Sequence, residues 1–196
     1  MASVNTNVGA MVALQNLNKT NSQLQTVQNR INTGLAVASA KDNGGIYAIA
    51  QNMRAEVGSL RAVNNSLDLA VSVVDVGLAA GDAISDLLIE MKEKALAASD
   101  VSLDSASRTA LNEDFKALRD QISTIVENAE FNGINLIDGS VTGGVSALAN
   151  ADGTNTINVA SENMSLSGTI LAFSASTEIN TQTLAAAAVT AIDSAL

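Results

Sequence analysis

The sequence predicts a mainly α fold: an elongated antiparallel bundle of long helices of coiled-coil type, with a small β-hairpin-rich region at its far end. Apolar residues recur every seven positions over long stretches, which is typical of helices that pack along a seam. Aromatic residues make up only 2% of the chain although 47% of it is hydrophobic, and small aliphatic side chains favour close helix–helix packing. Three Asn-Gly or Asp-Gly pairs cluster between residues 132 and 153, which indicates tight hairpin turns there.

The first predicted domain, residues 1–40, is a helix with very little charge. Ser3, Asn5 or Thr6 can cap its start. The segment carries two basic and no acidic residues, whereas the whole chain has a net charge of −10. A solvated helix normally carries more charge, so we expect another molecule to cover it, although packing on its own domain is the alternative. The expected interface residues are Leu14, Leu17, Leu24, Val27 and Ile31.

The helical pattern breaks at Thr33-Gly34 and again at Asn43-Gly44-Gly45. It resumes over residues 46–98, where two apolar stripes keep a seven-residue spacing and predict a helix about 80 Å long. Gly77 and Gly81 indicate a bend or a close helix crossing in it. The first stripe consists of Ile46, Met53, Leu60, Leu67, Val74, Leu88 and Ala95, and the second includes Ile49, Val63, Ala70, Ile84 and Met91.

A third helix is predicted over residues 104–129, capped by Ser102, Asp104 or Ser105, and a short connection makes it antiparallel to the second. Arg119 and Asp120 are expected to lie off its apolar face. Residues 41–139 thus form the second predicted domain, a rod-like helical one. The residues expected to pack it together are Met53, Leu60, Leu67, Val74, Leu88, Leu111, Phe115, Leu118 and Ile122.

Residues 140–180 are rich in Ser, Thr, Gly and Val and alternate roughly as strands do, which predicts a small β-rich surface segment. Within it, Asn150–Asn155 lacks the ligand spacing of a calcium loop and is interpreted as a turn. Residues 181–196 return to a helical pattern behind Thr181 or Thr183 as the cap.

The composition excludes several function classes. Without His or Cys the chain cannot hold a Ser-His-Asp or Cys-His catalytic set, so we expect no catalytic, metal or cofactor site. The acidic balance argues against nucleic acid. No run of 18 apolar residues exists, so membrane insertion is not expected, and the first residues lack the pattern of a signal peptide.

Two motifs resemble those of bacterial flagellin. The run from Gln28 to Gly45, QNRINTGLAVASAKDNGG, is similar to that family's N-terminal signature, and AEFNGINLIDG, Ala129 to Gly139, to a later segment. The opening SVNTNVGAMVALQNLN also fits. The residues matching the signature, the spoke motif, are Gln28, Arg30, Asn32, Thr33, Gly34, Ser39, Ala40 and Asp42, and the turn motif is Phe131, Asn132 and Gly133.

The resemblance implies a structural subunit that polymerises into the extracellular flagellar filament used for swimming. Residues 1–40 would line the hollow filament core, the spoke would join them to the outer helical domain, and neighbouring copies would cover the uncharged helix. Further implied partners are the flagellar export apparatus with its chaperone and the cap and hook-junction proteins. The implied export uses no cleaved signal peptide.

The sequence departs from the family pattern in two places. Only LAAAAVTAIDSAL stands where a long C-terminal helix is expected, so the chain is a fragment or a short member. Glu90 stands where flagellins read by the vertebrate cell-surface receptor have an Arg, which predicts weak recognition. Two alternatives remain open: a hook–filament junction protein, whose N-terminal helices look similar, and a cytosolic coiled-coil adaptor, which leaves the uncharged first forty residues unexplained.

Overall fold

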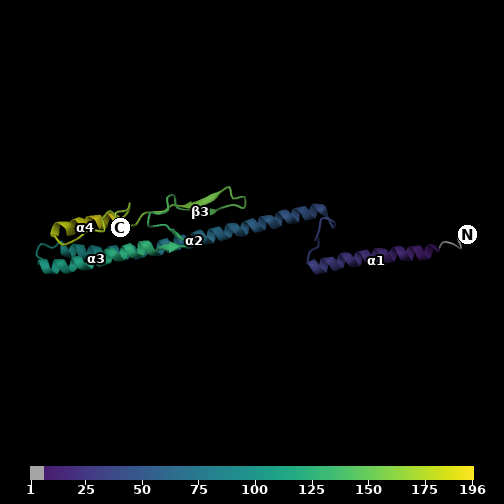
Figure 1. Ribbon diagram of the computed structural model, residues 1–196, viewed down its shortest axis with the longest axis horizontal. Coiled ribbons are helices and arrows are strands. Elements are labelled where there is room, and N and C mark those ends of the chain that lie inside the picture. Colours follow the sequence, from purple (N-terminus) through teal and green to yellow (C-terminus); the bar gives the residue numbers. More distant parts are fainter. Residues whose placement is uncertain (1–6) are drawn as a thin grey trace. The chain divides into compact units, whose positions relative to one another are not determined.

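The computed structural model describes residues 7–196 (Figure 1), and the chain divides into two compact units, residues 1–58 and 59–196. The described part is mainly α with a small antiparallel β part, as predicted. Its helices are α1 (Val8–Thr33), α2 (Gly44–Ala98), α3 (Ser105–Asn128) and α4 (Gln182–Ala195). Its strands are β1 (Glu130–Phe131), β2 (Ile134–Asn135), β3 (Val145–Leu148) and β4 (Thr156–Val159).

Helix α1 begins and ends at residues suited to those positions. The side chain of Asn7 accepts a hydrogen bond from the Ala10 N–H at 3.1 Å and caps the first turn. The predicted caps Ser3, Asn5 and Thr6 lie outside the described residues. Gly34 ends the helix in the left-handed conformation, with φ 67° and ψ 13°, which glycine adopts without the steric penalty of a side chain. The predicted break at Thr33-Gly34 is therefore confirmed.

The core of the second unit lies between α2, α3 and α4. Helices α2 and α3 run antiparallel: the Ala98 carbonyl accepts a hydrogen bond from Arg108, and Lys94 pairs with Asp114 further along. Asp104 caps α3 by accepting hydrogen bonds from two backbone N–H groups. Among the fully or almost fully buried side chains are Val73, Ile84, Leu88, Met91, Phe115, Ile122, Ile179 and Ile192.

Packing in the second unit agrees only in part with the predicted residue set. Leu88, Phe115 and Ile122 are buried, and Leu67, Val74, Leu111 and Leu118 are half-buried. Met53 and Leu60, however, are exposed by 61% and 47%, so within the described residues they are not core residues. The buried residues of α2 all lie from Val63 onwards. The 24 residues of α3 span only about 36 Å, and beyond its end the β3–β4 hairpin contacts α2, where the Leu148 N–H donates to the Ser66 hydroxyl at 3.1 Å.

Arg119 is buried with the apolar residues of α3, so the prediction that it lies off the apolar face is wrong. The residue is 8% exposed, and its guanidinium donates to the Thr177 carbonyl at 3.0 Å and to Asp120. Asn112 is also buried and its side-chain oxygen accepts a 2.7 Å hydrogen bond from the Ile179 N–H. The segment before α4 therefore provides partners for two polar residues on the same buried face of α3 as Phe115.

Gly77 lies against a loop and does not mark a helix crossing. Helix α2 continues through Gly77 and Gly81 without interruption. A Cβ at Gly77 would lie 3.8 Å from Leu136 Cβ and 3.9 Å from Ile137 Cγ2. The close approach is therefore made by the loop after β2, and Gly81 has no such neighbour within 4 Å among the described residues.

The β part consists of two separate hairpins. Asn132 and Gly133, at φ 52° and 80°, form the two-residue turn between β1 and β2, in which Phe131 pairs with Ile134. Strands β3 and β4 pair from Val145↔Val159 to Leu148↔Thr156. The 150–155 turn joins them, as predicted. Residues 160–180 hold no strand, so the β-rich segment is shorter than predicted, because side-chain hydrogen bonds such as those of Asn163 organise this stretch instead.

Candidate functional site

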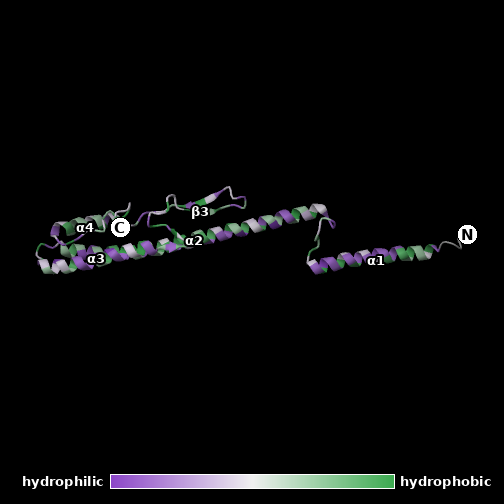
Figure 2. Ribbon diagram, viewed as in Figure 1, coloured by the Kyte–Doolittle hydropathy of each residue, from purple (hydrophilic) through white to green (hydrophobic). Residues whose placement is uncertain are grey.

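Helix α1 exposes an apolar face that nothing in the described chain covers. None of its residues is buried, and Figure 2 shows hydrophobic residues along its length. The predicted interface residues are exposed to the following extents: Leu14 59%, Leu17 56%, Leu24 53%, Val27 48% and Ile31 74%. Burial of one such side chain stabilises a contact by roughly 1.5–3 kcal/mol. A helix with this much uncovered apolar surface is suited to association rather than to isolated existence.

A second uncovered apolar stripe lies on the N-terminal half of α2. Its residues follow a helical spacing of three or four positions, and each is about half exposed or more. They are Ile46 52%, Ile49 61%, Met53 61%, Val57 50% and Leu60 47%. This stripe continues into the buried face of α2 at Val63, so the same seam that packs the second unit extends beyond the reach of α3.

Asp42 organises the connection between α1 and α2. One oxygen of its carboxylate accepts hydrogen bonds from the N–H groups of Ala38 and Ser39, both at 3.1 Å, and from the Ser39 hydroxyl at 3.3 Å. The backbone hydrogen bonds from Ser39 and Ala38 lower the pKa of Asp42 below its ordinary value, and Arg30 adds a smaller effect in the same direction. Asn43 then caps α2 by accepting from the Ile46 N–H.

Other members of the spoke motif shape the same connection or remain on the surface. The Thr33 hydroxyl donates to the Asn29 carbonyl at 2.7 Å. Gln28, Arg30, Asn32 and Ala40 are exposed, and their side chains make no hydrogen bond among residues 7–196. The turn motif is also on the surface, where Phe131 is 39% exposed. The residue pattern alone did not predict that Asp42 holds the connection through hydrogen bonds to the backbone.

Glu90 lies exposed on α2. It is close enough to Lys94 to contribute to raising the pKa of that ammonium group, an effect caused mainly by the hydrogen bond and charge of Asp114. The Lys94–Asp114 distance is 2.9 Å. This surface therefore presents a carboxylate beside an ion pair.

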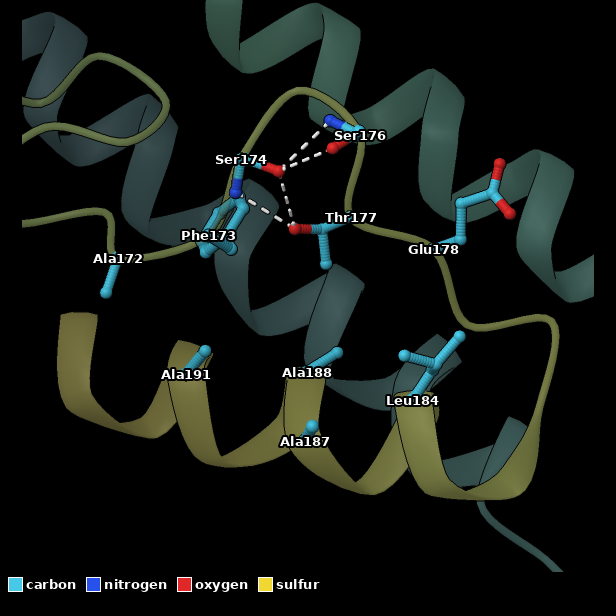
Figure 3. A pocket seen from close by; sticks show the side chains of 10 residues that line it. All are labelled: Ala172, Phe173, Ser174, Ser176, Thr177, Glu178, Leu184, Ala187, Ala188 and Ala191. Carbon is cyan, nitrogen blue, oxygen red and sulfur yellow. Dashed lines mark hydrogen bonds between the residues drawn. The ribbon is translucent and has the colours of Figure 1, made fainter.

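A shallow groove of about 450 Å³ lies between α4 and residues 172–178 (Figure 3). Its hydroxyl groups bind one another, with 2.8 Å between the oxygens of Ser174 and Ser176 and 2.9 Å from the Ser174 N–H to Thr177. Alanines form much of the opposite wall. Within residues 7–196 there is no cluster of acidic side chains placed to hold a metal ion, and none of the helices there is long and apolar enough to cross a membrane.

Comparisons with known proteins agree with one another. The family described as "Bacterial flagellin N-terminal helical region" matches residues 4–142. Flagellin FljK of Caulobacter vibrioides is 55% identical over 190 residues, covering 97% of this chain and 67% of that protein. Flagellin FljM of the same species is 51% identical over 194 residues, covering 99% and 70%.

Two more distant similarities cover less of this chain. Flagellin A of Rhizobium meliloti is 35% identical over 144 residues, covering 74% of this chain and 36% of that protein. The crystal structure of Bacillus cereus flagellin superposes with a TM-score of 0.57 at 24% identity, covering 68% of this chain and 74% of that one. That similarity concerns the fold alone.

Proposed function

We propose that this chain polymerises through the two apolar surfaces described above. It belongs to the bacterial flagellin family and is thus a structural subunit of the extracellular flagellar filament rather than an enzyme. The two surfaces are the apolar face of α1 and the stripe from Ile46 to Leu60 on α2. The observation that carries the proposal is the exposure of α1, of which no residue is buried.

The proposed core interface consists of Leu14, Leu17, Leu24, Val27 and Ile31. Their burial between copies supplies the free energy that holds α1 in place, since an uncovered apolar helix of 26 residues gains little from its own chain. The low charge of the helix supports this assignment, because few ionised groups then lose their hydration when the surface is buried. Residues 1–40 would accordingly act as the core segment of the filament.

The elbow between α1 and α2 is proposed to fix the direction in which α1 leaves the outer helical domain, residues 41–139. Gly34 supplies the backbone conformation and Asp42 ties the loop with hydrogen bonds. Residues 140–180 form the surface segment in this proposal, and residues 181–196 begin a helix that packs on α2.

Membership of the family also supports proposals about partners. We propose that the chain passes through the flagellar export apparatus with its chaperone, without a cleaved signal peptide, and meets the cap and hook-junction proteins at the ends of the filament. We propose in addition that Glu90 weakens recognition by the vertebrate cell-surface receptor, since an acceptor stands in place of a donor. A Glu90→Arg variant should then activate a receptor reporter more strongly than the unchanged chain.

The experiment that tests polymerisation is elongation from short filament seeds, followed by electron microscopy and sedimentation. A Leu17→Glu/Leu24→Glu variant should fail to elongate, because it puts two charges into the proposed core seam. A Gln15→Glu/Ser22→Glu variant adds the same charge to the opposite side of α1 and should grow nearly as well as the unchanged chain. Equal growth of both variants would refute the assignment of this face.

A further inference from the structure

One seven-residue repeat on α2 carries exposed charges that change sign once. The first two positions of this repeat are basic, Arg54 and Arg61, and the next three are acidic, Asp68, Asp75 and Asp82. All five side chains are exposed. Each step of seven residues turns only about 20° round the helix axis, so these residues follow a slowly winding stripe that begins as a basic stretch and continues as an acidic one.

The basic residues up to residue 61 differ from the later ones in whether they have partners within the chain. After residue 61, all five have partners within the chain: Arg108 donates to backbone carbonyls and the other four form ion pairs. Up to residue 61, none of the five forms an ion pair within residues 7–196. Residues 1–61 have a net charge of +3, from five basic and two acidic residues. Since the whole chain has a net charge of −10, residues 62–196 have a net charge of −13.

Exposed apolar residues stand between the charges at matching positions. Val57, 50% exposed, lies three residues after Arg54 and four before Arg61. Leu78, 63% exposed, holds the same position between Asp75 and Asp82. The two stretches therefore share one pattern, a charge, an apolar residue and a second charge, with opposite signs.

The acidic stretch also borders concave apolar surface. Asp75 lines a groove of about 320 Å³ beside Ala147 and Ile157 of the β3–β4 hairpin. Asp82 and Leu78 line a second groove, of about 340 Å³. Val74 belongs to both grooves, so the apolar surface next to the acidic stretch is continuous and large enough to receive side chains from another helix.

We propose that the stretch from Arg54 to Arg61 of one copy binds the stretch from Asp75 to Asp82 of a second copy, with the two α2 helices parallel. The stagger is 21 residues, or about 32 Å. Val57 then faces Leu78, with an Arg–Asp pair on either side. A shift of 14 residues would also pair the charges, but it would set Val57 against Val71, which is less exposed at 57% than Leu78. This proposal rests on the proposed function, because it names one contact by which copies assemble.

The arrangement produces an open chain of copies. Each copy offers a basic stretch to one neighbour and an acidic stretch to another, which is a head-to-tail contact. A closed antiparallel dimer would set Asp68 of one copy against Asp68 of the other, and like charges at an interface are costly. Individual exposed ion pairs contribute roughly 0–1 kcal/mol, so their main effect is to fix the register while Val57 and Leu78 supply the buried area.

Disulfide capture tests the register directly, because the chain has no cysteine. In a Val57→Cys/Leu78→Cys variant, mild oxidation of concentrated protein should give a ladder of cross-linked copies. A Val57→Cys/Leu69→Cys variant is the matched control. Leu69 is 38% exposed and lies on the opposite side of α2 from residue 71, which belongs to the same seven-residue repeat as Val57 and Leu78. Equal cross-linking of both variants would overturn the proposal.

Charge reversal tests the pairing. The Asp75→Arg/Asp82→Arg and Arg54→Asp/Arg61→Asp variants should each need at least about tenfold more protein to elongate seeds, and a one-to-one mixture should recover growth. Glu127→Arg/Asp152→Arg, at two exposed acidic residues elsewhere, should leave growth close to that of the unchanged chain. Unimpaired growth of both stretch variants alone would refute the pairing.

The two tests separate this inference from the proposed function. If the unchanged chain fails to elongate seeds but the 57–78 pair cross-links selectively, the proposed polymerisation of this chain is wrong and the contact stands. If the chain elongates and the 57–78 pair does not cross-link above the control, the contact is wrong and polymerisation stands.

Discussion

At the scale of single residues, a few polar side chains determine local structure that apolar patterns do not describe. Asp42 ties the loop between α1 and α2 through the N–H groups of Ala38 and Ser39. Asn112 and Arg119 join α3 to the segment before α4. Each interaction joins a side chain to the backbone, so it holds the path of a loop that has little core of its own.

Lowering the pH should loosen the elbow. Backbone hydrogen bonds from Ser39 and Ala38 depress the pKa of Asp42 in the folded chain, so its contribution is complete above the unfolded pKa of about 3.9 and is lost as the pH falls through the folded value. The protection of the Ala38 and Ser39 amides against exchange, relative to their intrinsic rates, should therefore decrease as the pH falls through that lowered pKa. Asp42→Asn should abolish that pH dependence, and an unchanged profile in this variant would contradict the assignment.

Asn112→Ala should destabilise the second unit by about 1–3 kcal/mol, because the buried Ile179 N–H would lose its acceptor. Urea unfolding followed by circular dichroism measures the change. Asn128→Ala on the same helix is the control: its side chain is exposed and bonds only the Thr124 carbonyl of its own helix. Equal losses for both variants would show that the buried bond has no special weight.

At the scale of elements, the repeats in the sequence predict helices more reliably than they predict what covers them. Seven-residue spacing correctly indicated α2 and α3, and Asn132-Gly133 correctly indicated a tight turn. The same spacing could not show that Met53 and Leu60 lie beyond the reach of α3, because a period identifies a face and not its partner. Burial of Arg119 and Asn112 depends on a segment about 60 residues away in sequence, for which the chain gives no local signal.

The two kinds of glycine should respond oppositely to alanine. Gly77→Ala should stabilise the chain by up to about 1 kcal/mol, because the new Cβ would make ordinary contacts at 3.8 and 3.9 Å. Gly133→Ala should destabilise it by about 1–2 kcal/mol, since φ is 80° there. Thermal unfolding of both variants gives the comparison. Destabilisation by Gly77→Ala would mean that the loop at Leu136 and Ile137 cannot accept a methyl group.

At the scale of the whole molecule, the two units differ in what they lack. The second has a buried core and, apart from Arg61, supplies partners for its own basic residues. The first exposes its apolar residues and leaves its basic residues without ion pairs among residues 7–196. The low charge of residues 1–40 predicted that another molecule covers them. The resemblance to flagellins implied that this molecule is another copy of the chain. In our proposal, assembly buries the exposed apolar residues of the first unit and gives its basic residues partners on other copies.

The measurement that tests this account most directly is hydrogen exchange of the α1 backbone amides in the monomer and in the polymer. We predict that amides from Val8 to Thr33 exchange rapidly in the monomer, where no residue of this helix is buried, and become strongly protected after polymerisation. Amides of the core residues around Phe115 and Met91 should be protected in both states and serve as the internal reference. Rapid exchange of α1 in fully formed polymer would contradict the claim that its apolar face is an assembly interface.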